Sequence, residues 1–351
     1  MQAHMTSLQR ILTTLDYKEP DRVPFFLPTI LHGAKELGIS LKEYFSRPEN
    51  VVEAQIRFRA RYRHDCVTNF FYSALEVEAW GAEVMYFDDG PPNAGAPIIR
   101  TREDIKYLQP PNIQKSSCLY KVLNATRMLR EKVDDAPVLG VVTSPLTLPV
   151  MQMGFDKYIE LMYEDPELFW QLMKVNEIFC VEWANAQLEA GATAIAYSDP
   201  VSSASIIPRE MYLKTGFEIA KRIISKIKGP TAIHMSAARC LPILTDIAQT
   251  GAIMIAASAL EDLAEIKSTC KGKLSVLGNL NAIEMIRWTP QQAESAVKEA
   301  IARVGPGGGY ILSDNHGEIP LQVPEEVLMA IAKAVHTWGH YPLEWVKDYD
   351  R

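Results

Sequence analysis

The chain has 351 residues, of which 48% are hydrophobic and 23% charged, and its formal net charge is −7. This composition is that of an ordinary soluble globular protein, and it disfavours a nucleic-acid-binding surface, which needs clustered Lys and Arg. Five scattered cysteines without a CxxC pair favour a reducing cytoplasm over a disulfide framework, and no apolar run reaches the roughly 18 residues of a membrane span.

The first part of the chain shows irregular patterning. About sixty residues are expected to form an irregular N-terminal extension that ends in a helix over 51–63. The stretch 88–97 collects turn-forming residues without periodicity, which predicts a loop. Short strands are predicted over 65–70 and 83–87, and a helix over 119–132.

The second part alternates strand-like and helix-like segments. Apolar, β-branched runs bounded by turn residues predict buried parallel strands over 137–144, 192–199, 230–236, 252–258, 274–280 and 309–316. Segments with helical periodicity fill the intervals: 158–191 (broken near Asp165), 208–228, 240–250, 260–270, 290–303 and 324–335.

Strand–helix alternation predicts an α/β protein whose parallel strands close into a (β/α)8 TIM barrel. The strand over 65–70 and the six later ones make seven, and an eighth is expected from the less regular first part. No GxGxxG motif follows the first strand, so a dinucleotide-binding fold has no support. No linker divides the chain, which predicts one domain over 1–351.

Four residues at predicted strand ends are candidate catalytic groups. They are Tyr72, Asp199, His234 and His316. In a (β/α)8 barrel such residues converge at one mouth, where the chemistry is located. Structural roles are the alternatives: a core position for Tyr72, a cap or turn for Asp199, a core histidine for His234 and a turn for His316.

Polar residues beside these candidates are expected to bind substrate. Ser144 and Asn279 lie at strand ends, Ser236 follows His234, and Asn315 precedes His316. His234 and His316 could also supply two ligands of a zinc ion, and a serine hydroxyl at 236 is a poor third ligand.

At these residues the chain resembles the uroporphyrinogen decarboxylase superfamily along nearly its whole length. That superfamily places decarboxylases and corrinoid-dependent methyltransferases on one TIM barrel. The resemblance rests on 15–24 (LDYKEPDRVP), 79–81 (AWG), 144–147 (SPLT), 189–192 (EAGA), 198–200 (SDP), 233–234 (IH), 277–280 (LGNL) and 316–320 (HGEIP).

The decarboxylase branch matches less well. Its members carry Arg-Gln-Ala-Gly-Arg after the opening Val-Pro, and the resemblance places Tyr72 where they use an aspartate. Here residues 25–33 read FFLPTILHG and contain no arginine, so charge-assisted contacts to tetrapyrrole carboxylates would be missing. His316 followed by Gly317 does match the decarboxylases.

The methyltransferase branch is similar at 185–192, 199–203 and His234. Its thiol-activating, methylcobamide:coenzyme M methyltransferase-like members bind zinc through His-x-Cys and a distant Cys, and the matching positions here are His234, Ser236 and His316. The resemblance therefore implies a zinc ion held by His234, His316 and a carboxylate such as Glu78, or no zinc. A harder His/carboxylate set suits an oxygen-bearing methyl donor.

The resemblance implies a cytoplasmic, corrinoid-dependent methyltransferase. It would move a methyl group between a methoxy compound, methanol, methylamine or thiol and methylcobalamin carried on a corrinoid protein, without nucleic-acid or membrane partners. One alternative is a carboxy-lyase that acts through Tyr72 and His316 on a tetrapyrrole or a smaller carboxylate. Another is a non-catalytic protein that binds a corrinoid or tetrapyrrole.

Overall fold

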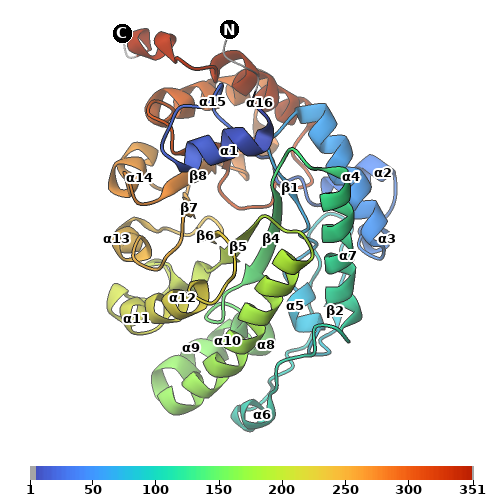
Figure 1. Cartoon of the computed structure of the whole chain (residues 1–351). Helices are drawn as coiled ribbons and strands as arrows, with labels where there is room; N and C mark the ends of the chain where they lie inside the picture. The colour runs from blue at the N-terminus through green and yellow to red at the C-terminus, as the bar shows by residue number, and fades with distance from the viewer. Residues whose placement is uncertain (1–4, 350–351) are drawn as a thin grey trace.

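The computed structural model describes residues 5–349. Within this range, seven parallel strands form one curled sheet in the order β1-β4-β5-β6-β7-β8-β9, and the helices surround it (Figure 1). A short antiparallel pair, β2 with β3, lies apart from this sheet. The strands are β1 (Val67–Thr68), β2 (Val84–Met85), β3 (Asn93–Ala94), β4 (Val138–Thr143), β5 (Ala194–Ser198), β6 (Thr231–His234), β7 (Met254–Ala256), β8 (Ser275–Leu280) and β9 (Tyr310–Asp314).

Helices connect successive strands of the sheet, and within residues 5–349 none of them is long and apolar enough to cross a bilayer. They are α1 (Ser7–Leu15), α2 (His32–Leu37), α3 (Leu41–Tyr44), α4 (Pro48–Tyr62), α5 (Leu75–Glu78), α6 (Arg102–Tyr107), α7 (Ser117–Lys132), α8 (Pro149–Met153), α9 (Phe155–Glu164), α10 (Pro166–Glu189), α11 (Arg209–Lys214), α12 (Gly216–Ile224), α13 (Leu244–Ile247), α14 (Leu263–Cys270), α15 (Pro290–Val304) and α16 (Glu325–Trp338).

Each of the six strands predicted in the second part contains an observed strand, which confirms those predictions. The predicted break near Asp165 separates α9 from α10, where the Asp165 side chain accepts the Leu168 N–H and Pro166 opens the new helix. The predicted helix over 208–228 is instead divided at Thr215, whose ψ of −85° ends α11.

The first part is more ordered than its pattern suggests. The N-terminal region expected to be irregular contains α1 to α4, and α1 begins with a capping box between Thr6 and Gln9. The predicted loop over 88–97 includes β3, whose Ala94 pairs with Val84 of β2. Of these elements, α2, α3 and β3 have only six, four and two residues, so tertiary packing decides them more than local periodicity does.

An extended segment from the N-terminal region lies between the two ends of the sheet. Phe26 donates its N–H to the Leu312 carbonyl of β9 at 2.9 Å, and Leu312 donates to the Pro24 carbonyl at 2.9 Å. On the other side, the N–H of Asp65 donates to the Phe25 carbonyl at 2.8 Å, just before β1 begins. Residues 24–26 thus connect β9 to the chain entering β1.

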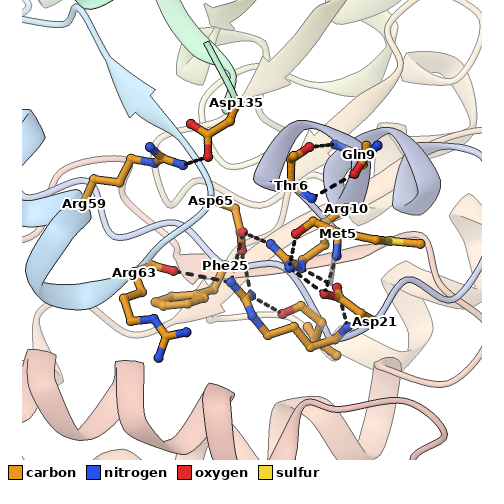
Figure 2. A network of polar contacts seen from close by, with 12 residues as sticks. Met5, Thr6, Gln9, Arg10, Asp21, Phe25, Arg59, Arg63, Asp65 and Asp135 are labelled. Atoms are coloured by element: carbon orange, nitrogen blue, oxygen red, sulfur yellow. Dashed lines mark hydrogen bonds and ion pairs between the residues drawn. The ribbon is translucent and has the colours of Figure 1, made fainter. Parts of the chain in front are cut away.

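A buried ionic network holds this segment in place (Figure 2). The Asp65 carboxylate accepts from Arg10 Nη1 at 2.7 Å, from Arg22 Nη1 at 2.8 Å and from the Phe25 N–H at 2.9 Å. Arg10 also pairs with Asp21, at 2.6 Å from its Nε. Charges taken out of water need such partners, so this network ties three separate parts of the chain together.

Candidate active site

A cavity of about 400 Å³ lies at the carboxyl ends of the parallel strands. Much of its wall is apolar, and its polar groups include His234, Ser236, His316 and Glu318. No arginine or lysine is found among the described residues that line it. A cavity of this size suits a small molecule, and its wall offers no cationic side chain to a carboxylate. Its apolar wall includes Phe26, Ile30, Leu31, Phe70, Val141 and Leu277.

Strand register places three polar side chains side by side in this wall. Thr143 of β4 is opposite Ser198 of β5, and Ser198 is opposite His234 of β6. Side chains alternate between the two faces of a strand, so the next residues, Ser144 and Asp199, point away from the cavity. Ser144 Oγ indeed donates to Asp199 Oδ1 at 2.6 Å in a buried cluster.

The tautomer of His234 is set by the backbone that follows it. The N–H of Ser236 donates to Nδ1 of His234 at 2.9 Å, so Nδ1 carries no proton and the neutral ring has its proton on Nε2. Nε2 is buried and has no hydrogen-bond partner among the described residues. Burial, with a smaller contribution from the neighbouring His316, lowers the pKa of His234 to about 4. His234 therefore presents a neutral N–H donor.

The second histidine has the opposite tautomer. Nδ1 of His316 lies 3.1 Å from Oδ1 of Asn315, and that oxygen also accepts the N–H of Ala282 at 3.2 Å. Because Oδ1 is an acceptor, Nδ1 of His316 must be the donor, which leaves the lone pair on Nε2. Burial lowers the pKa of His316. The site thus pairs one imidazole donor with one imidazole acceptor.

Two carboxyl groups, those of Asp314 and Glu318, lie next to His316 in the chain that follows β9. Oδ2 of Asp314 accepts the N–H groups of His316 at 2.7 Å and Gly317 at 2.9 Å, which fixes the turn after β9. Burial raises the pKa of Asp314 to about 6 and that of Glu318, which lines the cavity, to about 7.

The other predicted site residues lie outside the described lining of the cavity. Tyr72 donates its hydroxyl hydrogen to Oε2 of Glu78 at 2.7 Å, and Asn279 donates to the Ser258 carbonyl at 2.9 Å. The structure therefore brings together His234, Ser236 and His316, with Asn315 behind them. The other candidates do not line the cavity; they are Tyr72, Glu78, Ser144, Asp199 and Asn279.

Asp199 provides a test of the buried cluster behind the site. Burial raises its pKa from 3.8 to about 6, although hydroxyls of Ser144, Thr147 and Ser202 donate to it. Between these two values the folded state binds a proton that the unfolded state lacks, so the contribution to stability falls as pH rises and is lost above about 6.

We therefore expect the wild type to gain about 1 kcal/mol of unfolding free energy over Asp199→Asn when the pH is lowered from 8 to 5. Urea unfolding of both proteins at each pH measures this difference. Parallel pH profiles for the two proteins would contradict the raised pKa.

The three residues expected to hold zinc do not form a metal site. Within residues 5–349, no three His, Cys, Asp or Glu side chains are grouped so that they could hold a metal ion. A metal-bound histidine normally donates its other ring N–H, whereas Nδ1 of His234 accepts one from Ser236. Glu78 is engaged with Tyr72. This donor set does not fit zinc.

Sequence reasoning missed most of the polar residues that line the cavity, among them Thr143, Ser198 and Glu318. Thr143 and Ser198 each precede a residue that was chosen, and only the strand register decides which of two neighbours faces inward. Glu318 follows His316 closely, and the HGEIP segment was the available signal for it.

Comparisons with known proteins agree on one family, but the similar proteins include both methyltransferases and decarboxylases. The uroporphyrinogen decarboxylase family model matches residues 6–338. A methylcobamide:CoM methyltransferase from Methanosarcina barkeri is 24% identical over 337 residues, covering 94% of this chain and 98% of the relative. A uroporphyrinogen decarboxylase from Cellvibrio japonicus is 24% identical over 308 residues, covering 83% of each. The solved structure of a methyltransferase from Methanosarcina mazei shares the fold, with a TM-score of 0.81, 21% identity, and coverage of 95% of this chain and 99% of its own.

Proposed function

Because the chain belongs to the uroporphyrinogen decarboxylase family, we propose that it is a methyltransferase of that family. The donor is a small, uncharged, oxygen-bearing methyl compound, and the acceptor is the reduced corrinoid of a partner protein. The observation that carries this proposal is the apolar cavity with two neutral histidines and no cation among its described lining residues. The similarity to a methylcobamide:CoM methyltransferase supports it.

We also propose that residues 24–26 occupy the eighth strand position of a single-domain (β/α)8 barrel. Their hydrogen bonds to Leu312 on one side and Asp65 on the other support this assignment. The cavity then lies at the carboxyl end of the barrel, where barrel enzymes place their chemistry.

The proposed reaction breaks the bond between the methyl carbon and the ether oxygen. The bonding pair stays on the oxygen, and the electron pair of the new bond to the methyl carbon comes from the reduced corrinoid cobalt. His234 donates a hydrogen bond from Nε2 to the oxygen as negative charge develops there. The ring does not release its proton, because Nδ1 already accepts the Ser236 N–H and loss of the Nε2 proton would leave an imidazolate.

Decarboxylation is the competing activity, since a uroporphyrinogen decarboxylase is equally similar in sequence. A substrate with many carboxylates would meet no arginine or lysine among the described lining residues. Desolvated carboxylates without such partners are strongly disfavoured.

Paired glycine variants test the function. Gly317 has a φ of +82°, and a Cβ there would lie 2.7 Å from Nε2 of His234; Gly307 has a φ of +81° with open space around it. Both alanine variants carry the same backbone strain, so only Gly317→Ala should disturb the site.

We expect the wild type and Gly307→Ala to transfer methyl groups from methoxybenzenes to cob(I)alamin, a reaction that is followed by absorbance. Gly317→Ala should react at least about ten-fold more slowly, because displacing a catalytic hydrogen-bond donor lowers the rate by at least that factor. Release of CO2 from uroporphyrinogen by the wild type, without methyl transfer, would assign the decarboxylase activity instead.

A further inference from the structure

We infer that a small molecule carrying a phosphate group binds in a second cavity, at the opposite end of the sheet from the candidate active site. This cavity has a volume of about 560 Å³. Its lining includes Arg22, Arg63 and Asp135, which come just before residues 24–26, β1 and β4 respectively. The cavity therefore lies at the amino ends of these segments, and a ligand there would be independent of the proposed methyl transfer.

The wall of this second cavity is rich in cations, although the net charge of the chain is −7. Its two carboxylates are already paired, Asp21 with Arg10 at 2.6 Å and Asp135 with Arg59 at 2.7 Å. The described lining of the first cavity contains no arginine or lysine. An anion would therefore enter the second cavity in preference to the first. The cations of the second cavity are Arg10, Arg22, Arg59, Arg63 and Lys132.

Two of these cations are available to a ligand. Within residues 5–349, no hydrogen bond or ion pair is recorded for the guanidinium group of Arg63 or the ammonium group of Lys132, and both residues are exposed. Figure 2 shows no dashed contact at the guanidinium group of Arg63, whereas the backbone carbonyl of this residue accepts from Arg22. The N–H of Arg63 donates to the Arg59 carbonyl at 2.8 Å, so these two arginines follow each other by one turn at the end of α4.

The amino-terminal end of α1 reaches the same cavity. Thr6, the cap of this helix, and Ser7, its first residue, both line the wall. No acidic side chain is present in the first turn, so nothing there offsets the positive end of the helix dipole. The start of a helix is a favourable place for an anion, and here it faces a cavity that also holds unpaired cations.

These features favour a phosphate group over a carboxylate. A phosphate monoester carries a charge of about −1.5 to −2 at neutral pH, and its oxygens can accept from several donors at once. Guanidinium groups and the N–H groups of a helix start are the donors that phosphate commonly meets in proteins. The cavity is in the size range of small-molecule sites, so it can also hold an organic part attached to the phosphate.

Calorimetric titration of the full chain tests the site. Ribose 5-phosphate and inorganic phosphate are the probes, and sodium chloride at the same ionic strength gives the background. We expect saturable binding of at least one of the two probes. Tighter binding of the ester would assign an organic phosphate as the ligand, and equal binding would assign phosphate itself; both results support the site.

Arg63→Gln removes an unpaired guanidinium group, and we expect it to weaken phosphate binding at least about ten-fold, the usual effect of losing a hydrogen bond to a charged group. Arg63→Lys keeps the charge without the planar fork and should lose less affinity. Arg47→Gln is the matched control, because Arg47 is an exposed arginine paired with Glu49 at 3.5 Å and does not line the cavity. It should bind phosphate as the wild type does.

Ser7→Asp separates binding from stability. An aspartate in the first turn of α1 should stabilise the helix, so the urea midpoint should not fall, whereas its negative charge should weaken phosphate binding about three-fold or more. No saturable binding above the chloride background would overturn the inference. Binding that is unchanged in both Arg63→Gln and Ser7→Asp would also overturn it, because the phosphate would then bind elsewhere on the protein.

Discussion

Replacing His234 with alanine is expected to slow methyl transfer to cob(I)alamin by about 100- to 1000-fold, the usual loss when one preorganised donor to a developing oxyanion is removed. His234 has its proton on Nε2, where negative charge would develop on the donor oxygen. The hydrogen bond strengthens as the C–O bond breaks, so the loss should fall mainly on kcat and less on KM. Steady-state kinetics with an aryl methyl ether would separate the two constants.

Two matched variants show whether the donor itself is responsible. His234→Gln places an amide N–H near the position of Nε2 and should recover part of the lost rate. His340→Ala removes an exposed histidine and should retain the wild-type rate. A rate for His234→Ala within about three-fold of the wild type would show that no oxyanion donor acts from this position, because its loss costs far more.

The sequence predicts the strands of this fold better than the side chains of its site. Buried β-branched runs identify β4 to β9, because strands covered on both faces have a continuous apolar pattern. That same continuity hides which face each residue occupies. Ser144 and Asp199 were therefore chosen at positions where Thr143 and Ser198 line the cavity. His234 was found because β6 ends at it, and His316 because it lies in the turn that follows the end of β9 at Asp314.

The hydrogen-bond partners of the side chains in the site cannot be predicted from a single sequence. The tautomers of the two histidines depend on the N–H groups of Ser236 and Ala282, and Ala282 is distant from His316 along the chain. The extended segment at 24–26 also cannot be recognised from its local sequence, because its hydrogen-bond partners belong to β9 and to Asp65. Contacts between distant segments, and not local propensity, decide these features.

Asp65→Ala is expected to destabilise the fold by about 3–5 kcal/mol, the usual cost of leaving buried charges unpaired. Asp65 is fully buried, and its carboxylate pairs with the guanidinium group of Arg10 (Figure 2). It also pairs with the guanidinium group of Arg22. Arg10 would keep Asp21, but no other carboxylate is recorded as an ion-pair partner of Arg22 within residues 5–349. The Phe25 N–H would also lose its acceptor. Urea unfolding, followed by circular dichroism, measures the change.

Asp135→Ala is the matched control for this prediction. Asp135 pairs with Arg59 at 2.7 Å, but its side chain is 43% exposed, so water replaces the lost partner. Such a pair contributes about 0–1 kcal/mol. If both variants lost the same small amount, the Asp65 network would not be what holds residues 24–26 between β9 and β1. If Asp65→Ala alone is strongly destabilised, the placement of residues 24–26 between β9 and β1, and with it the Phe26 wall of the cavity, depends on one buried carboxylate.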